Sequence, residues 1–345
     1  MLLHDMPVEI LNSIVEKFDS AYTLNALTRT SRQFHALFNP ELYRHNTKFQ
    51  RSSALLWAAE RGSEATYKNS LKAEAALGVA VDGGQTPLHL AAKNGHSLIV
   101  ELILQEHGVD PNANDICGWT SLSWAAENGH TKVVQLLLVK DGVIPDAKDD
   151  DGRTPLSRAA ENGHSTIVDL LLTEEEVDPD SKDKEGRTPL SWAAEHGHAP
   201  VLELLLSRDR VKPDAEDIRG CTPLSWAAKY GQTLVMEMLL ADEKVNPNSS
   251  DNAGRTALSW AAGSGNLEAV KLLLADNRTN PNSGDNRGRS PLSWAAANGF
   301  VLIVGSFLRD DRVVVDSKDD RQRTPLNWAE RRRHPAVVDL LGKSD

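Results

Sequence analysis

The chain has 345 residues and a formal net charge of −11, with 40% hydrophobic and 25% charged residues. No stretch approaches the roughly 18 uninterrupted apolar residues that a membrane-spanning helix needs, so we expect no membrane partner. The acidic balance is unsuited to phosphate backbones, which reward clustered Lys and Arg, and we expect no nucleic-acid partner.

Residues 1–46 form a segment of their own, with apolar side chains at helical spacing and none of the periodicity found later in the chain. The pattern predicts about three short helices. Residues 1–50 contain five basic and five acidic side chains, so the whole net charge lies on the remainder. On physical grounds alone, this segment could simply cap the structure that follows.

Three motifs in the same segment suggest a more specific role: Met6-Pro7-Val8-Glu9-Ile10-Leu11, Leu24-Asn25-Ala26-Leu27 and Thr30-Ser31-Arg32-Gln33-Phe34-His35. Together they resemble an F-box over about residues 1–45, although Met6 stands where that family usually has Leu. The resemblance implies docking on the Skp-type adaptor of a cullin-RING ubiquitin ligase. It also implies that Pro7, Ile10 and Leu11 contact the adaptor.

The remainder of the chain is an internal repeat. A Thr-Pro-Leu-like motif begins every 34 residues, at Thr86, Thr120, Thr154, Thr188, Thr222, Thr256, Ser290 and Thr324. A period of this length predicts stacked units, each of which buries its apolar face only against its neighbours.

Each unit predicts a pair of helices. Thr188 is a good N-cap and Pro189 suits the first helical position, where a missing N–H costs nothing. Leu190, Ala193 and Ala194, at i, i+3 and i+4, form a narrow apolar face, and Gly197 provides a C-terminal stop. A denser apolar run over 201–206 predicts the second helix, which ends before Pro213.

The pattern Gly-x-Thr-Pro-Leu-x-x-Ala-Ala-x-x-Gly-His closely resembles the ankyrin repeat signature over about residues 81–345. The wording Arg-Thr-Pro-Leu-Ser-Trp-Ala-Ala is similar to ankyrin arrays of filamentous fungi. The resemblance implies an all-α solenoid of helix-turn-helix-hairpin units. The sequence departs from the family in having Ser or Asn where His is usual, except at His89, and in a period one residue longer than the usual length of about 33.

The ends of the array differ from its middle, as a solenoid requires where a terminal unit faces water. Gln322 and Arg333 replace glycines of the other complete units, and residues 53–62 read as a degenerate repeat. We therefore assign an F-box-like domain to 1–46, a degenerate first repeat to 47–82, repeats to 83–116, 117–150, 151–184, 185–218, 219–252, 253–286 and 287–320, and a C-terminal capping repeat to 321–345.

The histidines of the array do not suggest chemistry. Five occupy equivalent positions in different units, as a repeated structural hydrogen bond would require: His96, His130, His164, His198 and His334. A metal site needs ligands within roughly 2.0–2.1 Å of one ion, not one repeat apart. No nucleophile-elbow or phosphate-loop motif is present either. We expect no catalytic residue, no cofactor and no metal.

A column of tryptophans occupies one position of the first helix, at Trp124, Trp192, Trp226, Trp260, Trp294 and Trp328, with Leu90 and Arg158 as exceptions. Equivalent positions in a stack lie side by side, so we expect the rings to pack as a ladder between repeats. Arg158 is expected within about 6 Å of a neighbouring ring as a cation–π partner.

Positions that vary between units at the hairpin tips and first helices are the candidate partner contacts. They include Ile116, Cys117, Trp119, Lys184, Glu185, His196, Ile218, Arg219, Cys221, Tyr230, Asn252, Asn286 and Arg287. Arrays that resemble this one bind proteins on their concave side, and Trp119 and Tyr230 are the expected anchors. Two functions follow: a ubiquitin-ligase substrate receptor, or a non-catalytic scaffold whose N-terminal helices only cap the array.

The compartment is predicted from the N-terminus and the cysteines. Asp5 stands where a signal peptide has Lys or Arg, and Glu9 soon interrupts the apolar residues. Cys117 and Cys221 lie three repeats apart, beyond disulfide reach, and both should be free thiols. We expect a cytoplasmic or nuclear protein that is a monomer on its own.

Overall fold

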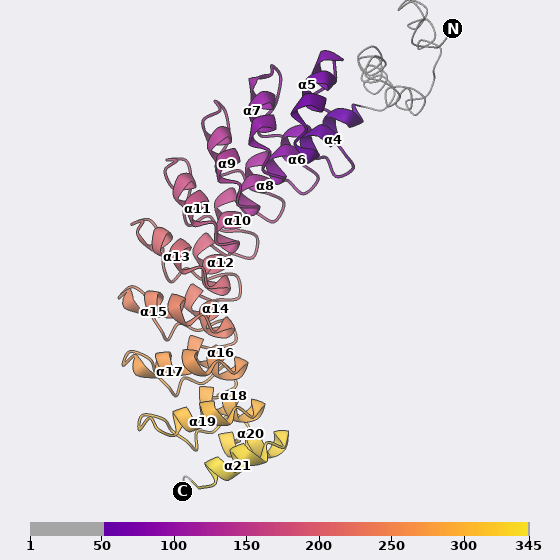
Figure 1. Ribbon diagram of the computed structural model, residues 1–345. Helices are drawn as coiled ribbons and strands as arrows, with labels where there is room; N and C mark the ends of the chain where they lie inside the picture. The colour runs from indigo at the N-terminus through magenta and orange to yellow at the C-terminus, as the bar shows by residue number, and fades with distance from the viewer. Residues whose placement is uncertain (1–51, 344–345) are drawn as a thin grey trace, which may run out of the picture. The chain divides into compact units, whose positions relative to one another are not determined.

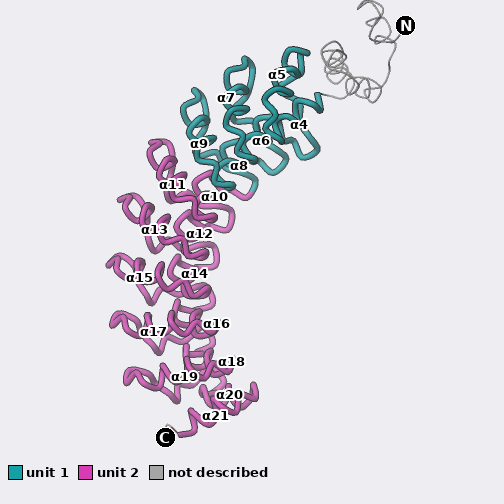
Figure 2. The backbone as a smooth tube through the Cα atoms, viewed as in Figure 1, with its two compact units in different colours: residues 1–150 teal, residues 151–345 magenta. Residues whose placement is uncertain are grey.

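The computed structural model describes residues 52–343 (Figure 1). The chain divides into two compact units, residues 1–150 and 151–345, and each is considered by itself (Figure 2). Every regular element in the described part is an α-helix, and none of these helices is long and apolar enough to cross a bilayer. The expected all-α repeat architecture is thus confirmed, while the F-box-like segment lies outside the described residues.

Helices alternate between two layers within each unit: the first helix of each repeat has an even label and the second an odd one (Figure 1). Unit 1 contains α4 (Ser53–Arg61), α5 (Glu64–Lys72), α6 (Pro87–Lys93), α7 (Ser97–Gln105), α8 (Ser121–Glu127) and α9 (Thr131–Leu138). Unit 2 contains α10 (Pro155–Glu161), α11 (Ser165–Leu171), α12 (Pro189–His196), α13 (Ala199–Leu206), α14 (Pro223–Tyr230), α15 (Thr233–Ala241), α16 (Ala257–Ser264), α17 (Leu267–Ala275), α18 (Pro291–Asn298), α19 (Val301–Phe307), α20 (Pro325–Arg332) and α21 (Pro335–Leu341).

The first helices begin as their sequence predicts. The Thr188 hydroxyl accepts a hydrogen bond from the Ser191 amide at 3.3 Å, and Pro189 occupies the first turn of α12. This cap satisfies one of the amides that a helix start leaves without an intrahelical partner. At α6, where the family's usual histidine is retained, His89 also accepts from the Thr86 amide and donates to the Trp119 carbonyl.

The core of each unit runs between the two layers. Ala193 and Ala194 of α12 are fully buried, and their small side chains let neighbouring first helices pack closely. Val201, Leu202 and Leu205 of α13 are also fully buried, so both helices of the repeat contribute apolar side chains to the core.

The repeated histidine links consecutive repeats. His198 Nε2 donates to the carbonyl of Glu161 in the preceding repeat at 2.9 Å. The same bond joins His96 to Glu60, His130 to Lys93, and His334 to Ala297. The predicted structural role is therefore confirmed at these four positions. Gln232 and Asn266 replace the histidine in their repeats and bond the equivalent carbonyls.

The same link explains the glycine that ends most first helices. Gly163 has φ +74°, and a Cβ at this position would lie 2.5 Å from the His198 ring. Both the left-handed backbone and the neighbouring ring therefore exclude other residues. Arg333 holds the equivalent position in the last repeat with φ 62°, where no further repeat follows in the described chain to contact its Cβ.

This comparison predicts opposite effects of two substitutions. Gly163→Ala should lower the free energy of unfolding by about 2 kcal/mol or more, because it combines backbone strain with a clash. Arg333→Gly should raise it by about 1 kcal/mol, because it relieves strain alone. Urea denaturation followed by circular dichroism measures both. Equal and small effects would contradict the proposed role of the His198 ring.

Candidate protein-binding surface

A buried aspartate organises each hairpin between repeats. Asp217 Oδ1 accepts hydrogen bonds from the amides of Arg219 and Cys221 at 2.8 and 2.9 Å, and its Oδ2 accepts from Trp226 Nε1 at 3.0 Å. Equivalent aspartates are buried at Asp115, Asp149, Asp183, Asp251, Asp285 and Asp319. These aspartates were not singled out from the sequence, although their 34-residue spacing is visible there.

The hairpin tips are hydrogen-bonded to one another from repeat to repeat. The Ile218 amide donates to the Glu185 carbonyl at 2.9 Å, and the Asn252 amide donates to the Arg219 carbonyl at 2.8 Å. The Asn252 side chain adds a bond to the Ile218 carbonyl at 2.9 Å. The tips therefore form a rigid strip that presents its side chains outward.

Cations separate the rings of the tryptophan column in unit 2. The Arg187 guanidinium lies 3.5 Å from the ring centre of Trp192 and 4.4 Å from that of Trp226. Lys229 bridges Trp226 and Trp260 in the same way, and Arg289 bridges Trp294 and Trp328. The expected ladder of packed rings is thus corrected at these three contacts, where a cation lies between two indoles, since cations favour the electron-rich ring faces.

Arg158 is buried, as its place within the column requires. It pairs with Asp151 at 3.6 Å and with Glu161 at 3.9 Å, so it is not extended into solvent. Arg153, at 3.8 Å, and Arg187 both lie over the Trp192 ring. These two hairpin arginines were not singled out from the sequence.

In the hairpins at Asp251 and Asp319, the arginine four residues after the aspartate competes with the indole. Arg255 Nε donates to Asp251 Oδ2 at 2.9 Å, and Trp260 Nε1 is left buried without a hydrogen-bond partner. In the last repeat Arg323 and Trp328 share Asp319 Oδ2. Burial opposes ionisation of Asp319, but hydrogen bonds from Arg323 and from backbone amides outweigh it and hold the pKa of this carboxyl below its usual range.

The predicted contact residues are mostly exposed, on what we call the first-helix face: the hairpin tips and the carboxyl ends of the even-numbered helices. Exposed members are Ile116, Cys117, Lys184, Glu185, His196, Ile218, Arg219, Tyr230, Asn252, Asn286 and Arg287. Trp119 is half-buried because it packs on Trp124, with ring centres 4.4 Å apart. Cys221 is a correction: it is buried beside Asp217, and burial raises the pKa of its thiol to about 12.

Two predicted contact residues are held by the tryptophan column. The Tyr230 ring stacks on Trp226 at 6.3 Å and is 49% exposed. His196 stacks on Trp192 at 6.2 Å in the same manner. Burial and a hydrogen bond with Glu195 raise the pKa of Tyr230. Because neighbouring rings hold these side chains, binding of a partner here would carry a lower entropic cost.

Unit 1 places an apolar depression on its own first-helix face. A hollow of about 410 Å³ is lined by residues that include Trp57, Val81, Gln85, Leu90 and Lys93. Trp57 holds the column position of the first repeat and is 52% exposed, and Leu90 holds that position in the next repeat. Leu90 was predicted as an exception to the tryptophan column, whereas Trp57 was not predicted to belong to it.

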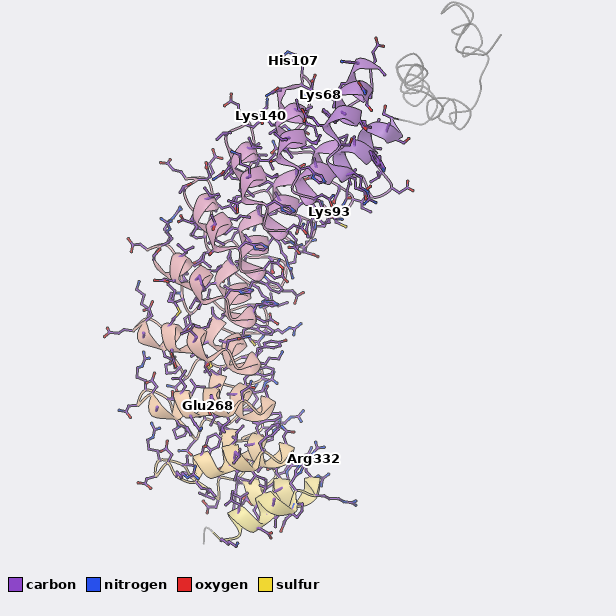
Figure 3. All side chains as sticks on the ribbon, in the orientation of Figure 1. Lys68, Lys93, His107, Lys140, Glu268 and Arg332 are labelled. Carbon is purple, nitrogen blue, oxygen red and sulfur yellow. The ribbon has the colours of Figure 1, made fainter. Side chains whose placement is uncertain are left out.

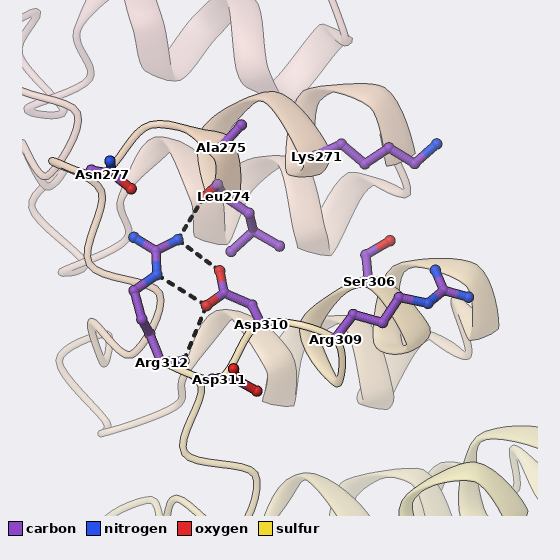
Figure 4. A pocket seen from close by; sticks show the side chains of 9 residues that line it. All are labelled: Lys271, Leu274, Ala275, Asn277, Ser306, Arg309, Asp310, Asp311 and Arg312. Atoms are coloured by element: carbon purple, nitrogen blue, oxygen red, sulfur yellow. Dashed lines mark hydrogen bonds and ion pairs between the residues drawn. The ribbon is translucent and has the colours of Figure 1, made fainter.

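A second hollow, of about 550 Å³, lies on the opposite side of unit 2, among α17, α19 and the loops that follow them (Figure 4). Its Arg312 is bound by Asp310 and also donates to the Leu274 and Thr279 carbonyls of the preceding repeat. Arg278 joins Asp276 to the Leu240 carbonyl in the same way. This hollow is therefore a recurring seam between repeats.

The remaining site predictions concern metals and the adaptor. No group of three or more His, Cys, Asp or Glu side chains in residues 52–343 could hold a metal ion. Pro7, Ile10 and Leu11 lie outside the described residues.

The cation ladder predicts unequal costs for two arginines. Arg187 is buried, pairs with Glu195 and contacts two indoles, so Arg187→Ala should lower the free energy of unfolding by about 3 kcal/mol. Arg219 is exposed, and its ion pair with Glu185 is long, at 3.8 Å, and open to solvent. Arg219→Ala should therefore lower the free energy of unfolding by less than about 0.5 kcal/mol. Urea denaturation of the two variants measures both changes in the free energy of unfolding. If the cation–indole contacts did not stabilise the fold, both changes would be small.

The low pKa of Asp319 predicts a pH dependence. A carboxyl whose pKa falls on folding adds stability above its unfolded value of about 3.9 and loses it as the pH drops through the folded value. Asp319→Asn should therefore destabilise the protein at pH near 7, and its difference from the unmodified protein should shrink below about pH 4. The exposed Asp316→Asn is the control. A difference that is constant over this range would contradict the assignment.

Comparison with known proteins agrees with this geometry. The family model described as ankyrin repeats (three copies) matches residues 29–115, 55–149, 122–217, 159–251, 210–285 and 258–345. Zygote-specific protein 3 of Chlamydomonas reinhardtii is 43% identical over 60 residues, which are 17% of this chain and 16% of that protein. The chain thus spans about a sixth of this relative's length. Since the matches to the family model together cover residues 29–345, the chain belongs to the ankyrin-repeat family.

Proposed function

We propose that this protein is a substrate receptor of a Skp-cullin-F-box ubiquitin ligase, in which residues 1–46 bind the adaptor and the first-helix face binds a protein substrate. The ankyrin repeats make the array a protein–protein interaction module. The proposal for substrate binding is supported by one observation above all: exposed side chains that differ between repeats are held in place by the fold. Ile218 lies on the hydrogen-bonded strip of hairpin tips, and Tyr230 stacks on Trp226.

The adaptor half of the proposal is supported by the F-box resemblance of residues 1–45, with Pro7, Ile10 and Leu11 as the adaptor contacts. No catalytic residue or cofactor is needed by a receptor of this kind, because it only holds the substrate near the ligase. Ankyrin-repeat proteins are typically non-enzymatic, which agrees with that role.

A second function is favoured by the range of the family match. The first match begins at residue 29, inside the F-box-like segment. This favours a non-catalytic scaffold in which residues from 29 onward cap the array and bind no adaptor. The two functions differ in whether Ile10 and Leu11 contact another protein.

We also propose a cytoplasmic or nuclear location. Cys117 and Cys221 are free thiols, of which one is exposed, and reducing compartments maintain that state.

Adaptor binding separates the two functions. The full chain mixed with a purified Skp-type adaptor should form a complex in size-exclusion chromatography, and Ile10→Asp plus Leu11→Asp should abolish it, because charges would replace apolar contacts. Ile218→Asp plus Tyr230→Asp is the matched control on the first-helix face, and it should leave the complex intact.

Three outcomes would favour the scaffold. These are no complex, a complex that is indifferent to the Ile10 and Leu11 substitutions, or a complex lost equally in both double variants. Circular dichroism melting of each variant shows whether the array remains folded.

A further inference from the structure

The arginines of residues 151–343 divide into those whose side chains have an ion pair or hydrogen bond within the described structure and those whose side chains have neither. Ten are ion-paired with carboxylates: Arg153, Arg158, Arg187, Arg208, Arg219, Arg255, Arg278, Arg289, Arg312 and Arg323. Arg210 donates to the Val177 carbonyl. The other six, in this part of the chain, have neither an ion pair nor a side-chain hydrogen bond to a described residue: Arg287, Arg309, Arg321, Arg331, Arg332 and Arg333.

All six belong to the last two repeats, and five of them, all but Arg309, lie on the first-helix face. Arg287 and Arg321 are hairpin-tip residues, and the Asp320 amide donates to the Arg287 carbonyl at 3.0 Å, so the two tips are adjacent. Residues 331–333 lie at the carboxyl end of α20. All five are exposed, and we call them the basic end.

The repeat itself shows that these two groups face the same side. Asp151 of a hairpin tip and Glu161 at the end of α10 both pair with Arg158, so these two positions lie on the same side of a repeat. In the last repeat the corresponding residues are Arg321 and Arg331. Arg332 corresponds to Tyr230 and projects from the layer of even-numbered helices, whereas Glu268 belongs to the other layer (Figure 3). The described acidic side chains of this repeat at the same face are Asp320 and Glu330, alongside the paired Asp319.

We propose that the basic end binds an acidic, carboxylate-rich segment of the protein partner. This inference rests on the proposed function, because it names the chemistry of the partner that the array holds. The whole chain has a net charge of −11, whereas the basic end has five exposed guanidinium groups without a carboxylate partner in the described structure. The charge of this surface is therefore opposite in sign to that of the chain. Guanidinium groups bind carboxylates through paired hydrogen bonds, and opposite charge also accelerates the encounter.

The rest of the face favours a protein segment over nucleic acid. On the first-helix face of the first two repeats in unit 2, the carboxylates Asp151, Glu161, Glu185 and Glu195 are each ion-paired with an arginine. Exposed Ile218 and Tyr230 follow on the next repeat. A long polyanion that tracked this face would therefore meet paired arginines and then apolar side chains, whereas a peptide can be acidic at one end and apolar further along.

Short side chains lie between the aromatic and the basic positions. Gly263 and Ser264 on α16, and Ala297 and Asn298 on α18, hold the positions that Lys229 and Tyr230 hold on α14. Because these side chains are short, the surface between Tyr230 and Arg332 has no large side chain at these positions. An extended peptide of about ten residues spans roughly 33 Å, which is enough to cross three or four stacked helices.

The test uses the full chain and a fluorescein-labelled peptide of about ten alternating glutamates and glycines, matched to that span. Fluorescence anisotropy should detect binding that weakens as salt rises from about 0.1 M to about 1 M, where the Debye length falls to about 3 Å. Arg321→Glu plus Arg332→Glu should weaken binding about tenfold or more.

Lys271→Glu plus Arg309→Glu is the matched control, since it places the same charge change on the seam between α17 and α19. Its affinity should stay within about twofold. Equal losses in the two variants would overturn the proposal, because binding would then follow net charge alone. A lysine-glycine peptide that binds as well, or no binding of the acidic peptide at low salt, would also overturn it.

A single-stranded oligothymidine of similar charge forms a third arm. Tighter binding of this oligonucleotide at Arg321 and Arg332 would replace the acidic peptide by a nucleic acid as the ligand. The adaptor complex is measured separately through residues 1–46. Loss of one activity without the other therefore shows whether the basic end or the receptor function has failed.

Discussion

The first-helix face depends on a carboxylate buried at the base of each hairpin. Asp217 fixes two backbone amides with one oxygen and an indole N–H with the other, so it joins the hairpin to the first helix. A buried carboxylate is costly unless its oxygens are hydrogen-bonded, and here the bonds that satisfy it also define the loop. The hairpin tip can then vary in sequence, because its backbone path is set from below.

The same carboxylate explains why the tryptophans recur with cations between them. An indole that donates to Asp183 or Asp217 turns one face toward the next repeat, where an arginine or lysine can cover it. In the later hairpins the arginine takes the carboxylate oxygen itself, as Arg255 does at Asp251. Charge, hydrogen bonding and ring stacking are thus shared among the same few positions of each repeat.

Much of this arrangement was predictable from the sequence, and the limits are physical. Helix starts follow from local residues such as Thr188 and Pro189, and a local rule suffices to predict them. The histidine links were predictable because only a repeated role accounts for equivalent histidines. The position of the Arg187 guanidinium was not predictable, because it depends on contacts with two indoles in different repeats. Cys221 was misjudged because variability between repeats was taken as exposure, while its thiol packs beside Asp217. Residues 1–51 lie outside the described structure, so the adaptor contacts remain predictions.

The distribution of charge shows how a stable array can also be selective. Arginines within the stack, such as Arg187 and Arg323, are used internally by carboxylates and indoles, and they offer little to a partner. Arginines at Arg321 and Arg332 have the same chemistry but no internal use in the described structure, so binding a carboxylate there disrupts no existing ion pair. A partner gains most where its charges replace water and not an existing ion pair. If the face binds a partner as we propose, its selectivity depends less on the number of charges in a repeat than on which of them have no ion-pair partner within the described structure.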